Sequence, residues 1–333
     1  MSALVRSFGT NNLAATDTEG SSRPCHARPT QKSDGHPARK SDAHPPPPRC
    51  YTAAMPDFAL SDTFTIHYEE WGDPSSPPVV LLHGFTASHR MWFQQVEVLA
   101  SEYRVIAPDA RGHGRTTSPE DPGEYGIERY AADLAALLDS LGVEVCALAG
   151  SSFGGMIALQ FATTWPERVA ALVISDASPA YEHPAYDERF RKREAGIREN
   201  EEVVRKRGTA ALGKKLATDV EDGFLADGIR NRFAALDSNG YLGASLTRRT
   251  RPDLTSLLGA RLTMPVLLCD GEDDPVFCAL ELMARELPHA RVVAVRGAGH
   301  GLPVQRPAIF IEAVLDFLHD VEEGKSVAGR RRV

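Results

Sequence analysis

The sequence predicts an α/β fold in which a mostly parallel β-sheet is covered by helices on both faces. Several short apolar runs lack polar alternation, which is typical of strands buried on both faces. Helical patterns separate several of these runs, and one earlier segment alternates between apolar and polar residues, as a half-exposed antiparallel strand does. Buried strands that alternate with helices favour a parallel sheet, because parallel neighbours need long crossover connections.

Residues 1–54 differ from the rest of the chain and predict a disordered N-terminal tail. The segment contains the run Pro45 to Pro48 and carries seven Lys or Arg against four Asp or Glu, with almost no apolar periodicity. Such a composition cannot bury enough apolar surface to offset the entropy of ordering the chain. It lacks the apolar core of a secretory signal, and its acidic residues argue against an organellar transit peptide. Met55 is an alternative start of the protein.

The elements of the sheet follow from residue 64 onward. Apolar and polar side chains alternate over residues 64–71, which predicts one antiparallel strand. Continuous apolar runs predict six buried strands, at residues 78–82, 105–107, 145–149, 171–174, 266–269 and 292–295. Helical periodicity predicts helices at residues 130–141, 155–165 and 278–287.

The alternation of strands and helices stops between residues 181 and 258. This stretch has no buried-strand run, is dense in charge at first and then reads as amphipathic helices. We therefore expect an inserted helical subdomain at 181–258 and a core formed by 55–180 and 259–323. The last residues, 324–333, predict a flexible basic tail.

The pentapeptide Gly150-Ser151-Ser152-Phe153-Gly154 follows a predicted strand and opens a predicted helix. A G-x-S-x-G pattern in this context predicts a sharp turn that lifts a nucleophilic hydroxyl above the sheet at a helix N-terminus. Ser151 competes for the role, but the glycines flank Ser152 at the required spacing. The sequence therefore predicts Ser152 as a nucleophile, with an ordinary strand–helix turn as the alternative.

The segment His83-Gly84-Phe85 ends the predicted strand upstream of this turn. A glycine just past a strand lets the backbone approach a ligand, and free N–H groups there can bind an oxyanion. We expect the backbone N–H groups of Phe85 and Phe153 to form this oxyanion hole.

A histidine that can accept the proton of Ser152 is expected on the glycine-rich loop Gly297-Ala298-Gly299-His300-Gly301, which follows a late strand. Imidazole is the natural proton acceptor near pH 7. His113 is the main rival, and we interpret it as a loop-packing residue.

The acid that orients His300 is expected after the predicted strand 266–269, where four carboxylates lie close together. We predict Asp274, which follows the turn at Gly271 and precedes Pro275. Asp270 is expected at the strand end, and Asp176, after the strand 171–174, is a competitor that can reach the same imidazole.

The overall composition excludes some classes of protein. The 333 residues have a net charge of −8, which argues against a nucleic-acid-binding surface. No apolar run approaches the ~18 residues of a membrane span. Five cysteines without disulfide or metal spacing favour a reducing compartment, so we expect a cytoplasmic protein.

Five motifs in order give the chain a resemblance to a known family from about residue 58 to 321. They are His83-Gly84-Phe85, Asp109-Ala110-Arg111-Gly112-His113-Gly114, Gly150 to Gly155, Gly271-Glu272-Asp273-Asp274-Pro275 and Gly297-Ala298-Gly299-His300. The chain resembles the α/β-hydrolase superfamily, in its alpha/beta hydrolase fold-1 family. Within that family it is most similar to 3-oxoadipate enol-lactonases, small carboxylesterases and C–C bond hydrolases.

The resemblance implies an eight-stranded sheet, with 181–258 as a helical cap inserted after the sixth strand. It also implies that the protein needs neither a metal nor an organic cofactor. One departure is Gln305, where relatives often carry Glu before the proline of the last helix. We expect this difference to affect helix capping more than chemistry.

These residues predict a serine hydrolase that cleaves a small-molecule carboxylic ester or lactone through a Ser152–His300–Asp274 triad and an acyl-enzyme. Trp92 and Leu302 are expected to line an apolar substrate pocket with the two phenylalanines of the oxyanion hole. C–C bond hydrolysis or perhydrolysis on the same triad is the first alternative. A ligand-binding homologue with little turnover is the second.

Overall fold

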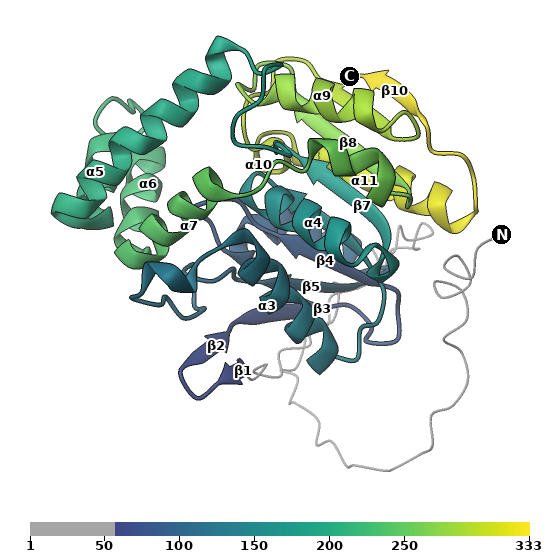
Figure 1. Cartoon of the computed structure of the whole chain (residues 1–333), viewed down its shortest axis with the longest axis horizontal. Coiled ribbons are helices and arrows are strands. Elements are labelled where there is room, and N and C mark those ends of the chain that lie inside the picture. Colours follow the sequence, from purple (N-terminus) through teal and green to yellow (C-terminus); the bar gives the residue numbers. More distant parts are fainter. Residues whose placement is uncertain (1–56) are drawn as a thin grey trace, which may run out of the picture.

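A computed structural model of the chain describes residues 57–333 (Figure 1). The predicted N-terminal tail at 1–54 and the alternative start at Met55 lie outside the described residues, as do Cys25 and Cys50.

The centre of the fold is an eight-stranded sheet with the strand order β10-β9-β8-β7-β6-β4-β5-β3. Its strands are β3 (Tyr68–Trp71), β4 (Pro78–Leu82), β5 (Arg104–Pro108), β6 (Cys146–Ser151), β7 (Val169–Ser175), β8 (Val266–Gly271), β9 (Arg291–Val295) and β10 (Gly329–Arg332). All neighbours pair in parallel except β3, which runs antiparallel to β5. The predicted fold class is confirmed, and each of the six apolar runs lies in a strand of this sheet.

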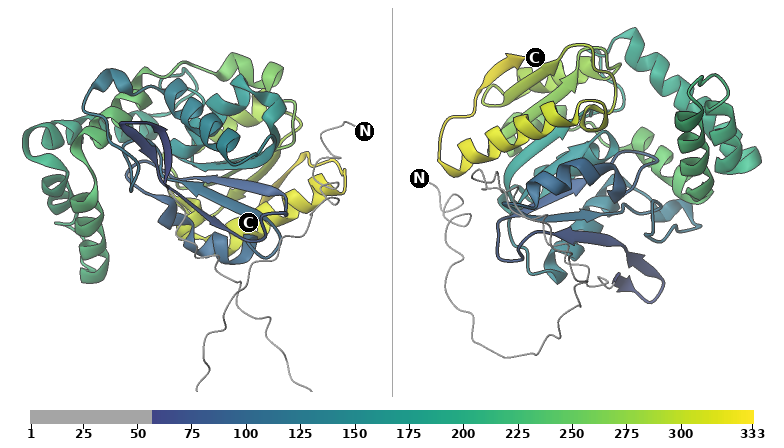
Figure 2. Two further views of the ribbon diagram at one scale, coloured as in Figure 1. Left: turned by 90° about the horizontal axis from the view of Figure 1, so that it is seen from below. Right: turned by 180° about the vertical axis from the view of Figure 1, so that it is seen from behind.

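Helices cover both faces of the sheet, as the continuous apolar runs predict. One face packs against α3 (Ile127–Ser140), α4 (Phe153–Thr164), α8 (Leu258–Arg261) and α9 (Phe277–Glu286), and the other against α2 (Phe93–Leu99), α10 (Leu302–Gln305) and α11 (Pro307–Glu322). We call the face that packs against α2, α10 and α11 the rear face; the right-hand view of Figure 2, from behind, shows α11 on it. Successive residues of one strand enter different cores: Val80 and Leu82 pack with α3 and α4, whereas Val79 and Leu81 pack with α2 and α11. Because alternate side chains of such a strand are buried in two different cores, the strand has no exposed position for a polar side chain.

The single strand predicted at 64–71 is wrong, because the structure divides it into two. β2 (Phe64–Ile66) pairs with β1 (Phe58–Ser61) in a small separate sheet, whereas β3 joins the main sheet. The backbone of His67, between them, bonds to a loop: its N–H donates to Thr116 Oγ1 at 2.9 Å, and its carbonyl accepts from Asp109 N–H at 2.8 Å. These bonds to the loop take the place of the strand-to-strand hydrogen bonds that would have continued β2 into β3.

Three of the α-helices between β7 and β8 lie in the stretch predicted as an inserted subdomain. They are α5 (Glu188–Leu216), α6 (Gly223–Ala235) and α7 (Ser238–Thr250), and they lie together at one side of the sheet (Figures 1 and 2). Each begins after an aspartate whose side chain accepts a backbone N–H of the first turn, namely Asp187, Asp222 and Asp237. The long α5 is interrupted at Gly208, whose φ of 79° is not helical. Short 3₁₀ turns complete the described elements at His89–Trp92, Pro122–Glu124, Pro166–Arg168 and Thr255–Leu257.

The helix α7 is docked on the core through two glycines. A Cβ at Gly240 would overlap the backbone of Gly112, and a Cβ at Gly112 would lie 2.6 Å from Cα of Gly240. Only two residues without side chains allow the backbones to approach so closely. This contact fixes the start of α7 on the loop that follows β5.

The prediction of a flexible tail at 324–333 is wrong for Gly329–Arg332, which form β10 at the edge of the sheet beside β9. Val327 is buried and Val333 packs against the same core, so the strand is held by apolar contacts at both ends. Each arginine of the strand pairs with a carboxylate of the folded chain: Arg330 with Glu281, Arg331 with Glu312 and Arg332 with Glu272.

No helix in the described part of the chain is both long enough and apolar enough to cross a membrane.

Candidate active site

The turn between β6 and α4 has the geometry that the glycine spacing predicts. Ser152 has φ 54° and ψ −112°, a strained conformation for a residue with a side chain. A Cβ at Gly150 would overlap the carbonyl of Gly154, and a Cβ at Gly154 would overlap the carbonyl of Leu82 in the neighbouring strand. Gly150 is therefore required by the sharpness of the turn, and Gly154 by the close approach of the neighbouring strand.

Ser152, His300 and Asp274 form one hydrogen-bonded chain. Ser152 Oγ lies 2.9 Å from His300 Nε2, and His300 Nδ1 lies 2.8 Å from Asp274 Oδ2. Because a carboxylate can only accept, Nδ1 carries the ring proton and Nε2 presents its lone pair to Ser152. The structure thus brings together all three residues predicted as the triad, from the ends of β6 and β8 and the loop after β9.

The charge state of Asp274 suits this arrangement. Its side chain is fully buried, and Oδ1 accepts the N–H of Val276 at 2.8 Å. Burial alone would raise the pKa of Asp274, but the hydrogen bonds from His300 and from the Val276 N–H lower it below its usual value. Asp274 is therefore ionised at neutral pH and holds the imidazole in one tautomer.

Asp176, the competitor for the acid, lies beneath the histidine loop and braces it. One of its oxygens accepts the backbone N–H groups of Gly301 and Leu302 at 3.1 Å, and the other accepts the hydroxyl of Ser175 at 2.6 Å. The hydroxyl of Ser151 also donates to Asp176, at 3.3 Å. Asp176 thus ties the nucleophile turn to the loop of His300, whose ring is bonded to a different carboxylate.

A third carboxyl, Asp270, is buried at the end of β8, as the sequence predicts for its place in the strand. Its Oδ1 accepts the N–H of Gly271 at 2.7 Å. Burial and the neighbouring carboxylates Asp176 and Asp274 raise the pKa of Asp270 well above its usual value. The environment of Asp270 therefore favours the protonated form of its carboxyl group.

The segments predicted to form the oxyanion hole lie on either side of Ser152. A Cβ at Gly84 would lie 3.5 Å from Ser152 Cβ, so the segment of Phe85 is next to the nucleophile. His83 accepts Ala110 N–H with Nε2 at 2.9 Å and donates from Nδ1 to the carbonyl of Gly84 at 2.9 Å. In a trans peptide the C=O and N–H point in opposite directions, so the N–H of Phe85 points away from His83. Phe153 is the first residue of α4, where backbone N–H groups have no acceptor within the helix.

The prediction that Trp92 and Leu302 line a substrate pocket is wrong. Both are buried in the core beneath the rear face of the sheet, with exposed fractions of 0% and 1%. The ring of Trp92 packs on Phe310 of α11 at 5.9 Å between centroids. The backbone N–H of Leu302 bonds to Asp176, which turns its side chain into the core.

His113 is buried among aromatic rings, which agrees with its interpretation as a loop-packing residue. Its Nδ1 donates to the carbonyl of Arg111 at 3.1 Å, and its ring lies 6.0 Å from Phe153 and 6.1 Å from Phe85. Burial, helped by the nearby His83, lowers the pKa of His113 to about 3. The ring therefore stays neutral while the protein is folded.

This burial predicts that the protein loses stability in acid. The unfolded chain protonates His113 near pH 6.5 and the folded chain only near pH 3, so its contribution is complete above pH 6.5 and is lost as the pH falls between these values. The free energy of unfolding, from urea titrations between pH 7 and pH 5, should fall by up to about 1.4 kcal/mol per pH unit for this histidine. His113→Phe should flatten that slope, whereas the surface variant His319→Phe should not; equal slopes in both variants would contradict the assignment.

Gln305 clamps the loop of His300, which corrects the expectation that it affects mainly helix capping. Its Oε1 accepts the N–H of Gly299 at 3.0 Å, and its Nε2 donates to the carbonyl of His300 at 2.6 Å. Both bonds hold the backbone next to the imidazole. In the sequence, only the departure from the family pattern points to Gln305. Its role depends on the backbone conformation of the loop of His300, which the local sequence does not predict.

We expect Gln305→Ala to lower kcat about 10-fold with little change in KM, because one or two neutral hydrogen bonds position the imidazole. Gln305→Glu keeps the acceptor for Gly299 but places a carboxylate oxygen against the His300 carbonyl, so an intermediate loss is expected. Val304→Ala, at an exposed position of the same short helix, is the matched control. A loss that appears in KM alone would show that Gln305 does not position the imidazole.

Arg193, on α5, reaches the site although no pattern in the sequence points to it. Its Nη2 lies 2.8 Å from His300 Nε2. The two residues are 107 positions apart, and a single arginine in a charge-dense helix carries no motif.

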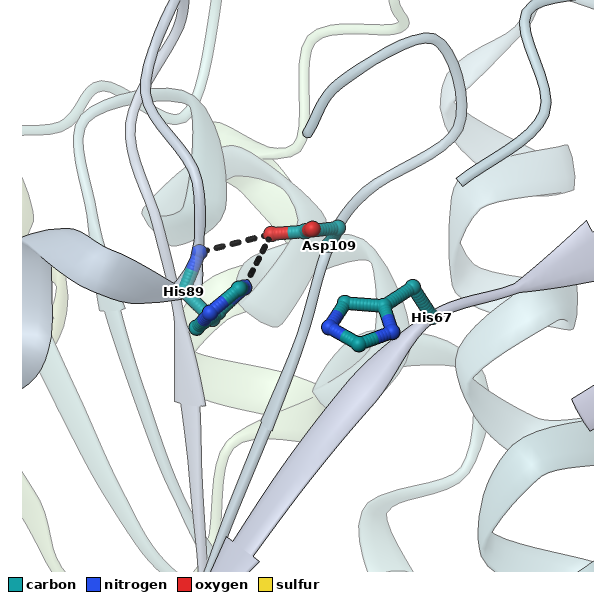
Figure 3. Close-up of side chains that lie close together, drawn as sticks. All are labelled: His67, His89 and Asp109. Atoms are coloured by element: carbon teal, nitrogen blue, oxygen red, sulfur yellow. Dashed lines mark hydrogen bonds and ion pairs between the residues drawn. The ribbon is translucent and has the colours of Figure 1, made fainter. Parts of the chain in front are cut away.

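A second cluster, His67, His89 and Asp109, also brings potential metal ligands within 4.8 Å of one another (Figure 3). Asp109 Oδ1 accepts the backbone N–H and the ring Nδ1 of His89, at 2.7 and 2.9 Å, and Oδ2 accepts the N–H of Arg115 at 2.9 Å. The guanidinium of Arg115 lies 3.5 Å from His67 Nε2, where it would repel a cation. Burial alone would raise the pKa of Asp109, but the hydrogen bonds from His89 hold it at about 2. We interpret the cluster as a hydrogen-bond network that fixes the loop after β5.

Comparisons with known proteins identify the family to which this fold belongs. A family model described as "alpha/beta hydrolase fold" matches residues 77–307. The chain is 32% identical to a putative 2-succinyl-6-hydroxy-2,4-cyclohexadiene-1-carboxylate synthase of Bacillus subtilis, over 80% of this chain and 98% of the relative. It is 27% identical to 3-oxoadipate enol-lactonase 2 of Acinetobacter baylyi, over 78% and 97%. A solved thermophilic esterase from Thermogutta terrifontis superposes with a TM-score of 0.67 at 30% identity, over 80% of this chain and 97% of that one.

Proposed function

The chain belongs to the alpha/beta hydrolase fold family and is a hydrolase, and from this premise we propose that it cleaves a carboxylic ester or lactone through an acyl-enzyme on Ser152. The observation that carries the proposal is the hydrogen-bonded chain from Ser152 through His300 to Asp274. Esterase and enol-lactonase relatives support the same class of substrate.

In the acylation step, Ser152 Oγ attacks the carbonyl carbon while its proton moves to His300 Nε2. The ionised Asp274 stabilises the imidazolium that forms. The N–H groups of Phe85 and Phe153 bind the negative charge on the carbonyl oxygen; one such donor contributes about 10²–10³ to kcat in other enzymes. The C–O bond then breaks, and His300 returns the proton to the leaving oxygen.

In the deacylation step, His300 takes a proton from water, and the hydroxide attacks the ester carbon on Ser152. The second tetrahedral intermediate uses the same two backbone donors. Its collapse releases the acid and returns the proton to Ser152 Oγ, so the enzyme is regenerated without further reagents.

The helices at 181–258 act as a cap in this proposal. Arg193 of α5 reaches His300, and Phe85 lies 4.8 Å from the ring of Tyr241 on α7. The cap therefore contributes side chains to the space above Ser152 and sets which small molecules enter it.

We also infer a reducing compartment such as the cytoplasm as the place of action. Cys146, Cys269 and Cys278, the three cysteines within residues 57–333, are all free thiols. Burial raises the pKa of Cys146 to about 12, so its thiol stays protonated and structural.

The function is tested with purified protein on p-nitrophenyl esters, lactones and vinylogous diketones, together with labelling by a fluorophosphonate probe. Turnover of esters or lactones with labelling of Ser152 is expected. Cleavage of diketones alone would identify a C–C bond hydrolase, and acyl transfer to hydrogen peroxide alone a perhydrolase. Labelling without turnover of any substrate would favour the ligand-binding alternative, and the absence of labelling would contradict Ser152 as nucleophile.

A further inference from the structure

Arg193 contacts the nitrogen atom of His300, Nε2, that must accept the proton of Ser152 in the proposed reaction. His300 Nε2 lies 2.9 Å from Ser152 Oγ and 2.8 Å from Arg193 Nη2. A neutral imidazole that donates from Nδ1 has one lone pair, at Nε2. The hydroxyl and the guanidinium therefore share a single acceptor.

This contact is incompatible with the imidazolium that forms during acylation. Once Nε2 carries a proton, it can no longer accept from Arg193, and two positive groups would face each other at hydrogen-bond distance. Arg193 must therefore leave His300 before or during the attack by Ser152. A group on the substrate that attracts the guanidinium would drive this movement.

The surroundings of Arg193 hold more positive than negative charge. Glu194 accepts from Arg193 at 2.6 Å and from Arg248 at 2.7 and 2.8 Å, so one carboxylate is shared by two guanidinium groups. Arg251, also buried, donates to the hydroxyl of Ser178 at 2.8 Å and to backbone carbonyls, which carry no charge. The counter-charge of Asp274 lies on the other side of the imidazole, where it accepts from Nδ1 of His300.

The burial of these cations is only partly compensated. Burial and the neighbouring Arg248 lower the pKa of Arg251 to about 10, and burial also lowers the pKa of Arg248. Nε of each of these two arginines is buried without a hydrogen-bond partner among the described residues. A bound anion would supply the missing charge.

A cavity large enough to hold a ligand lies next to Glu194, the carboxylate that Arg193 and Arg248 share. This cavity of about 530 Å³ has the carboxylates Glu182 and Glu194 in its wall, together with the cationic Arg191 and Arg198 and the rings of Tyr186 and Phe190. Its lining combines apolar surface with convergent charged groups, which is typical of small-molecule sites.

We propose that the substrate carries a carboxylate beside the scissile ester or lactone, and that this carboxylate binds Arg193 and draws it away from His300. Arg193 is then a specificity-determining residue, and the inference rests on the proposed function. A guanidinium binds a carboxylate through two parallel hydrogen bonds, which a neutral substrate cannot offer. A neutral ester leaves Arg193 on Nε2 and is turned over slowly even when bound.

The test compares two esters with the same leaving group, mono-p-nitrophenyl glutarate, which has a free carboxylate, and p-nitrophenyl pentanoate, which has none. For the unmodified protein, kcat/KM should be about 10–100-fold higher for the glutarate, the range for a charge-assisted hydrogen bond. Arg193→Met should abolish this preference and should raise kcat for the pentanoate about 2–10-fold, since Nε2 is freed. Arg193→Lys keeps the charge without the fork and should retain part of the preference.

Arg205→Met is the matched control, because it removes one arginine from the exposed side of the same helix, where Arg205 pairs with Glu202. It should keep the full preference for the glutarate. Melting temperatures of all variants show whether Arg193→Met remains folded, and Arg193→Lys carries the test if it does not. Equal kcat/KM for the two esters in the unmodified protein, or equal losses for both in Arg193→Met, would overturn the inference. Turnover of neither ester by the unmodified protein would instead count against the proposed function.

Discussion

Ser152→Ala is expected to lower kcat for ester or lactone hydrolysis by about 10⁴–10⁶-fold, because no other group can form the acyl-enzyme. The binding surface and the two backbone donors remain, so KM should change little. The measurement is kcat under saturating substrate, with fluorophosphonate labelling of the same preparations followed by mass spectrometry of the modified peptide.

Ser151→Ala is the matched control for this prediction, since it removes the adjacent hydroxyl from the same turn. Ser151 donates to Asp176 at 3.3 Å and is buried, so its loss should affect stability more than catalysis, with kcat reduced less than about 10-fold. A protein that still labels after Ser152→Ala, or a larger kcat loss in Ser151→Ala, would move the nucleophile to Ser151.

Asp274→Asn should lower kcat by about 10⁴-fold with the fold intact. An amide at this position can donate to Nδ1 of His300, which turns the imidazole to the tautomer that cannot accept a proton from Ser152. Acylation and deacylation should both slow, so pre-steady-state and steady-state rates should fall together.

Asp176→Asn tests whether Asp176 or Asp274 is the acid that orients His300, an alternative that the sequence leaves open. Asp176 accepts the N–H groups of Gly301 and Leu302, and an amide NH₂ group placed against them would loosen the loop of His300. We expect the free energy of unfolding to fall by about 1–3 kcal/mol and kcat by about 10–100-fold. A greater kcat loss than in Asp274→Asn, measured where both variants are folded, would make Asp176 the acid.

Much of the fold could be predicted from the sequence because its signals are local. The side chains of a strand such as β4 (Pro78–Leu82) are buried in two cores, so all of them must be apolar. The first and last residues of such a strand can therefore be predicted from the apolar run itself. The turn at Ser152 is partly local: a Cβ at Gly150 would collide with Gly154, four residues further on, whereas a Cβ at Gly154 would collide with Leu82 of the neighbouring strand.

The errors come from contacts between segments that are distant in the chain. The three arginines of β10 look like a solvated tail until Glu272, Glu281 and Glu312 face them. Trp92 is apolar and follows the oxyanion segment, but only the packing of α11 shows which side of the sheet it enters. Arg193 carries no motif, because only the packing of α5 in the folded chain places it against His300, 107 residues away in the sequence.

The strand β10 also changes how the molecule meets other molecules of its kind. Without it, the border of the sheet would be β9, whose residues Val292, Val293 and Ala294 are apolar and in register with Arg330, Arg331 and Arg332. An apolar border with unpaired backbone groups invites intermolecular strand addition. Along β10 the border instead carries exposed arginines held in ion pairs, and charged side chains on an edge strand disfavour pairing with another strand, so the same residues that complete the sheet also guard the protein against aggregation through this edge.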